Sequence, residues 1–64
     1  MQQIAKDGVV VTNMGSHIVT STGEQYILSG TVLLGPGNQV LSQHCQNIDQ
    51  AFGLVMGKHG GYRF

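Results

Sequence analysis

The sequence predicts a β-dominated α+β fold, a small antiparallel meander of about three to five strands with one helix near residues 42–56. Glycines recur at near-regular spacing in the first half of the chain and separate short runs of β-branched and apolar residues, which is typical of strands joined by turns. In the second half, the apolar residues step by 4, 3, 4 and 3 positions, which is the period of a helix. No linker interrupts the 64 residues, so we expect a single domain over 1–64.

The strands are predicted at 9–12, 17–22 and 25–34. Asp7-Gly8 is a two-residue hairpin signal, so residues 3–6 are expected to pair back on the first of these runs. The next two turns are expected at 13–15 and 22–24, because each contains a residue that tolerates the left-handed region.

The run 25–34 is apolar on both faces. If it is one strand, Ile27 and Leu33 lie on the face opposite Tyr26 and Leu28. A sheet with two apolar faces needs cover on both, so we expect Ile27 and Leu33 to contact a second copy of the chain. Gly30 indicates either a bulge within the strand or a turn that divides it into two.

The helix is predicted from its apolar stripe, with Ser42 as the N-cap and Gly57 with Lys58 at the end. The opposite face is polar and almost uncharged. It is either a solvated surface or a polar subunit contact, and in the second case Gln46 and Gln50 are the candidate interface residues.

A competing prediction is an all-β repeat of hairpins. Residues 8–20 align without gaps on 30–42, at an offset of 22 with three identities, and 53–60 is a fainter third copy. Such a repeat would replace the helix with a further hairpin.

Composition restricts how so short a chain is stabilised. Domains of this size bury only about 60% of their extended-chain surface, and they usually add disulfides, a metal or a partner subunit. The single cysteine, Cys45, excludes an internal disulfide, and the three histidines lack zinc-ligand spacing, so no metal or cofactor is predicted. Charged residues are only 9% of the chain, and the net charge is zero, which favours association. We therefore expect a homo-oligomer, at least a dimer.

Several partners and locations are excluded on the same grounds. Lys6, Lys58 and Arg63 form no basic stripe, so nucleic acid is not an expected partner. No segment approaches the 18 or so apolar residues of a membrane span, and the first residues lack the apolar core of a secretory signal, so we expect a cytoplasmic protein with no membrane partner.

No set of residues predicts an enzyme. His44 and Cys45 are neighbours in sequence, but neighbours on a helix diverge by about 100°, so the imidazole would not lie over the sulfur, and Cys45 is expected to be buried. The only acidic residues are Asp7, Glu24 and Asp49; the first two fall in predicted turns, and the chain is too small to enclose a cleft that holds a carboxylate pair. No catalytic residue is assigned.

The chain end is the candidate ligand site. Two of the three cations fall within the last seven residues, next to glycines and two aromatic residues. An anionic, planar ligand such as a nucleotide would use Arg63 as a fork to phosphate, Lys58 as a point charge and Tyr62 as a stacking platform. The alternative is a solvated tail whose aromatic residues add an edge strand to the sheet. The candidate ligand-binding residues are Lys58, His59, Gly60, Gly61, Tyr62 and Arg63.

Together, these observations predict a non-enzymatic, homo-oligomeric binding or interaction protein. One alternative is an oligomeric small-molecule binder that takes an anionic, nucleotide-like ligand at subunit boundaries. Another is a structural component of a larger assembly such as a virion. The partner is expected to be the chain itself, with an anionic small molecule or another protein as further possibilities.

Overall fold

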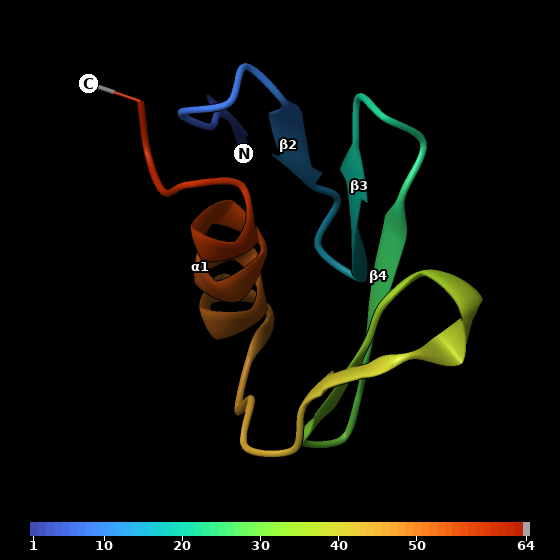
Figure 1. Ribbon diagram of the computed structural model, residues 1–64. Helices are drawn as coiled ribbons and strands as arrows, with labels where there is room; N and C mark the ends of the chain where they lie inside the picture. The colour runs from blue at the N-terminus through green and yellow to red at the C-terminus, as the bar shows by residue number, and fades with distance from the viewer. Residues whose placement is uncertain (64) are drawn as a thin grey trace.

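The computed structural model describes residues 1–63 and confirms the predicted fold class (Figure 1). Six antiparallel strands form a meander in sequence order, and one helix follows them. The elements are β1 (Gln2–Ile4), β2 (Val10–Asn13), β3 (His17–Thr20), β4 (Gln25–Ser29), β5 (Val32–Leu34), a 3₁₀ turn (Pro36–Asn38), β6 (Val40–Ser42) and α1 (Ile48–Lys58).

The core lies between the inner face of the sheet and α1, which runs beside β2 (Figure 1). The sheet and the helix both contribute completely buried side chains, because alternate residues of a strand and every third or fourth residue of a helix point the same way. The largest are Val11, Ile18, Tyr26, Leu33, Phe52, Val55 and Met56. Cys45 is also buried, as expected.

The strand count of six exceeds the prediction because 40–42 forms a further strand, β6, and because the run 25–34 is a hairpin of two strands. Gly30 and Thr31 form its turn, and Ser29 pairs with Val32. Across this turn Leu28 pairs with Leu33 and Ile27 with Leu34, so the alternation of a single continuous strand does not apply. Leu33 therefore lies in the core, and Leu34 shares the outer face with Ile27.

The helix begins later than predicted. Residues 40–42 pair with β5 as β6, and the Cys45 amide donates to the Thr31 carbonyl at 2.9 Å, so the chain up to this point is held against the β4–β5 turn. Asn47, and not Ser42, is the N-cap, and its side chain accepts a hydrogen bond from the Gln50 amide. The all-β alternative is wrong for the third repeat, because 53–58 is helical. None of the helices in residues 1–63 has the length and apolar character needed to cross a membrane.

Candidate functional site

The chain end folds back onto the first hairpin instead of projecting into solvent. Gly60 and Gly61 both have φ near +90°, which reverses the chain directly after α1. The Lys6 amide then donates to the Gly61 carbonyl at 3.0 Å, and the Arg63 amide donates to the Ile4 carbonyl at 3.2 Å. Tyr62 also forms an isolated antiparallel bridge with Ala5, so residues 61–63 lie beside the end of β1 without forming a further strand. Phe64, the other aromatic residue of the edge-strand alternative, lies outside the described residues.

Lys58 and His59 lie in a charged cluster, here called the carboxylate cluster, with Asp7, Glu24 and Tyr26. His59 Nδ1 lies 2.8 Å from Asp7 Oδ2, and Lys58 Nζ donates to the Tyr26 hydroxyl at 3.2 Å and lies 3.8 Å from Glu24 Oε2. Asp7 comes from the β1–β2 turn and Glu24 from the residues before β4. The cluster therefore joins two turns of the sheet to the end of the helix.

The His59 ring is enclosed in this cluster, with its side chain only 12% exposed. Its Nε2 atom is fully buried and lies 3.3 Å from Glu24 Oε1, but the geometry does not make a hydrogen bond. The hydrogen bond between Nδ1 and Asp7 orients the ring, while Nε2 faces Glu24 without a hydrogen bond.

The environment shifts the pKa of two members of the cluster. A hydrogen bond from the Val9 amide, followed by the contact with His59, holds the pKa of Asp7 below its ordinary value. The hydrogen bond to Tyr26, followed by attraction to Glu24, raises the pKa of Lys58 above its ordinary value. Both side chains therefore stay charged at neutral pH and have partners within the protein, and the Lys58 side chain is 41% exposed. Within residues 1–63, no three His, Cys, Asp or Glu side chains are grouped so that they could hold a metal ion.

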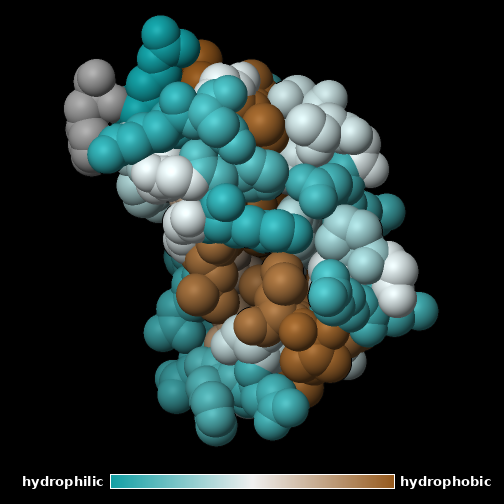
Figure 2. All heavy atoms as spheres, in the orientation of Figure 1, coloured by the Kyte–Doolittle hydropathy of each residue, from teal (hydrophilic) through white to brown (hydrophobic). Residues whose placement is uncertain are grey.

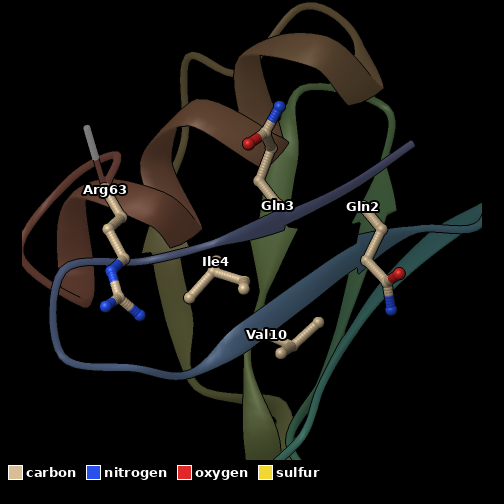
Figure 3. Close-up of a pocket in the computed structure, with 5 residues that line it drawn as sticks. All are labelled: Gln2, Gln3, Ile4, Val10 and Arg63. Atoms are coloured by element: carbon tan, nitrogen blue, oxygen red, sulfur yellow. The ribbon is translucent and has the colours of Figure 1, made fainter.

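Tyr62 and Arg63 lie outside the carboxylate cluster that contains Lys58 and His59. The Tyr62 ring packs against Phe52, with 6.5 Å between ring centroids, and does not form a platform beside Lys58. Arg63 instead lines a surface groove of about 460 Å³ together with Gln2, Gln3, Ile4 and Val10 (Figure 3). The structure thus divides the six candidate residues between an internal charged cluster, a chain reversal and a groove.

The groove and the partners of the cluster were not predicted from the sequence. Gln2, Gln3, Ile4 and Val10 lie more than fifty positions before Arg63, and no local motif connects them. Asp7 was recognised only as a turn residue.

The candidate interface residues also divide into two groups. Ile27 is 45% exposed on the outer face of the sheet, whereas Leu33 is completely buried within the protomer and cannot reach a second copy. Gln46 and Gln50 are exposed, and the Gln46 amide donates to Gln50 Oε1 at 2.8 Å, so this pair extends the helix cap.

Ile27 belongs to an apolar surface on the outer face of β4, β5 and β6, here called the neutral patch. Ile27 pairs with Leu34 and Leu34 with Val40, so the three side chains form a row across three strands, and Val32 lies beside them. Val40 is 50% exposed. Figure 2 shows a different group of hydrophobic side chains, on the surface between the lower end of α1 and the β5–β6 hairpin, which is the helix side of the sheet and not the neutral patch.

Comparison with known proteins adds no assignment. No protein-family model matches the chain, and neither a curated protein nor a solved structure matches it.

Proposed function

We propose that this protein is a non-enzymatic, homo-oligomeric interaction module whose subunits associate through the neutral patch. The observation that carries the proposal is the row Ile27, Leu34 and Val40, which is apolar, lies on the face opposite the helix and is not covered by any segment within residues 1–63. Apolar side chains that line up across adjacent strands gain free energy when a second surface removes them from water.

The charge distribution supports association with a second copy. Residues 25–48, which include β4, β5 and β6, contain no Asp, Glu, Lys or Arg. A two-fold contact places a surface against itself, so a neutral surface meets no like-charge repulsion there.

The edge of β6 extends this surface. β6 is the last strand of the sheet, and no other strand within the described part of the chain pairs with its outer edge. Natural proteins protect such edges with charged residues, commonly Lys, whereas β6 and its neighbours Gln39 and Gln43 are neutral.

A stable interface would cover a large share of the surface of so small a protein. A standard specific interface buries about 800 Å² on each partner, which is about a fifth of the 3878 Å² accessible surface of this protomer. Four patch residues do not supply that area alone, so the proposed interface includes the β6 edge.

Two features support a role other than catalysis. The Cys45 side chain is buried, and its Sγ donates to the Asn47 carbonyl at 3.4 Å, so the thiol is not available as a nucleophile. The second feature is that Asp7 and Glu24 both contact His59 within the carboxylate cluster, which gives these two acidic side chains a structural role.

The test is the mass in solution, measured by sedimentation equilibrium at micromolar concentration. We expect at least twice the protomer mass of 6.8 kDa. Ile27→Lys should reduce the mass to that of the monomer, because it places a charge in the middle of the patch. The matched control is Leu54→Lys, which changes a side chain of similar exposure (47%) on α1 and should keep the oligomer.

A wild-type protein that is folded and monomeric under these conditions contradicts the proposal, as does equal dissociation by both variants. Assembly into large rings or filaments would favour the structural role over a discrete oligomer.

A further inference from the structure

We propose that the groove beside β1 binds a small amphipathic monocarboxylate, with the carboxylate on Arg63 and the apolar body on Ile4 and Val10. This site goes beyond the proposed self-association and uses other residues. Its volume of about 460 Å³ falls within the range of about 300–1,000 Å³ that is usual for small-molecule sites.

The groove combines one charged end with an apolar middle. Figure 3 shows Ile4 between Arg63 and Gln2, with Val10 beside it on the neighbouring strand. Ile4 pairs with Val10 across β1 and β2, so their side chains share one face of the sheet. Ile4 is 44% exposed, which makes its side chain available to a ligand.

Arg63 has the geometry and freedom to bind the carboxylate. Its backbone is fixed beside Ile4 by the 3.2 Å hydrogen bond, and no acidic side chain within residues 1–63 lies within ion-pair distance of its guanidinium. A guanidinium binds a carboxylate through two parallel hydrogen bonds. At the other end, Gln2 Nε2 donates to Thr12 Oγ1 at 3.3 Å, which fixes the amide group and leaves its oxygen as an acceptor for a polar group of the ligand.

The composition of the groove favours a monocarboxylate over a nucleotide. Among residues 1–63, Arg63 is the single cation of the lining, and no lining residue is aromatic. Lys58 is held by Tyr26 and Glu24, and the Tyr62 ring packs on Phe52. A polyphosphate would lack a second cation here, and a base would lack a stacking partner.

The site is also separate from the neutral patch. β1 and β6 are at opposite ends of the strand order, and the groove residues belong to β1, β2 and the chain end. Ligand binding and self-association can therefore fail or succeed independently.

The test is a titration of the full chain with octanoate, followed by two-dimensional amide NMR. We expect saturable shifts at residues 2–4, 10 and 63, with a Kd of about 1 mM or tighter, as befits a ligand of this size. Arg63→Gln should weaken binding about ten- to a hundredfold, because it removes a charge-assisted hydrogen-bond pair. Lys6→Gln is the matched control, because it removes one exposed positive charge that does not line the groove, and it should bind as the wild type does.

A second variant covers the case in which Arg63→Gln disturbs the chain end. Ile4→Thr keeps a β-branched residue in β1 but removes apolar surface from the groove, and it should weaken octanoate binding several-fold. The proposal is overturned if octanoate causes no saturable shifts, or if Lys6→Gln weakens binding as much as Arg63→Gln does. It is also overturned if octanol, which lacks the charge, or ATP binds at the same residues as tightly as octanoate.

Discussion

At the scale of single residues, the glycines of the turns and of the helix differ in backbone conformation and in the space available for a Cβ. Gly53 lies inside α1, where a Cβ would meet no atom within 4 Å. Gly60 has a φ of +89°, and a Cβ there would lie 3.3 Å from the Lys6 Cβ. Alanine should therefore stabilise the first position and destabilise the second.

We expect Gly53→Ala to raise the free energy of unfolding by about 0.5–1 kcal/mol, because alanine loses less backbone entropy in a helix. Gly60→Ala should lower it by about 1 kcal/mol or more, because the left-handed region is strained for alanine. Urea unfolding followed by circular dichroism measures both. Equal effects of the two substitutions would contradict the assigned chain reversal at Gly60.

Asp7 should contribute a pH-dependent part of the stability. Its pKa lies below the ordinary value of 3.8 in the folded protein, so the folded state binds this proton less readily than the unfolded state does. The Asp7 carboxylate stabilises the folded protein fully above the ordinary pKa of 3.8, and this stabilisation is lost as the pH falls through the lower pKa of Asp7 in the folded state. We therefore expect Asp7→Asn to flatten the decrease of the melting temperature between pH 5 and pH 2.

His59→Gln is the companion variant for this measurement. The hydrogen bond from the Val9 amide is the first cause of the low Asp7 pKa, and this variant leaves it in place. Most of the acid dependence should therefore remain. If His59→Gln removes all of it, the imidazole contact and not the Val9 amide controls the titration.

The site could be predicted from the sequence only in part, for a physical reason visible at these residues. The concentration of charge and glycine near the chain end pointed to Lys58, His59 and Arg63. Their partners Asp7 and Glu24 lie at distant positions, and contacts between turns depend on the register of the strands, which composition does not determine.

At the scale of secondary-structure elements, the helix start shows how periodicity can mislead. Leu41 and Cys45 continue the apolar stripe backwards from Ile48, yet Leu41 lies in β6 and Cys45 in the connection. A spacing of three or four residues does not by itself prove a helix. The decisive signal was the cap, since Asn47 is followed by Asp49 and by Gln50 at the third helical position.

This assignment predicts different effects of two similar substitutions. Asn47→Ala should lower the free energy of unfolding by about 1 kcal/mol, because the Gln50 amide loses its 2.9 Å acceptor. Ser42→Ala removes only an exposed hydrogen bond with the His44 amide and should change it by less than about 0.5 kcal/mol. Urea unfolding measures both free energies. If Ser42→Ala destabilises the protein more than Asn47→Ala does, the helix begins near Ser42.

The internal repeat was predicted correctly in one respect. Its two copies, 8–20 and 30–42, contain β2 with β3 and β5 with β6, so the offset of 22 residues relates two hairpins. The glycines matched by the alignment, Gly8 with Gly30 and Gly15 with Gly37, have positive φ in each case. The third copy lacks this turn pattern, and its residues 53–58 extend α1 instead.

At the scale of the whole molecule, the two related hairpins are covered unequally. α1 packs on β2 and β3, in the first hairpin, whereas the outer face of β4 to β6 holds the neutral patch. Within residues 1–63, α1 is the only α-helix that covers the sheet. If a second copy supplies the remaining cover, as we propose, association adds to the stability of the folded protomer, and unfolding is coupled to dissociation.

Such a coupled equilibrium makes stability depend on protein concentration. For a dimer that unfolds to two chains, each tenfold increase in concentration adds about 1.4 kcal/mol to the apparent stability of the dimer. We therefore expect the melting temperature of the wild type to rise by several degrees from micromolar to hundreds of micromolar, measured by circular dichroism in cells of different path length. Ile27→Lys should melt at a lower temperature that does not change with concentration, whereas Leu54→Lys should retain the wild-type slope. A concentration-independent wild type would mean that the protomer is stable by its own core, and that the neutral patch contributes nothing to folding.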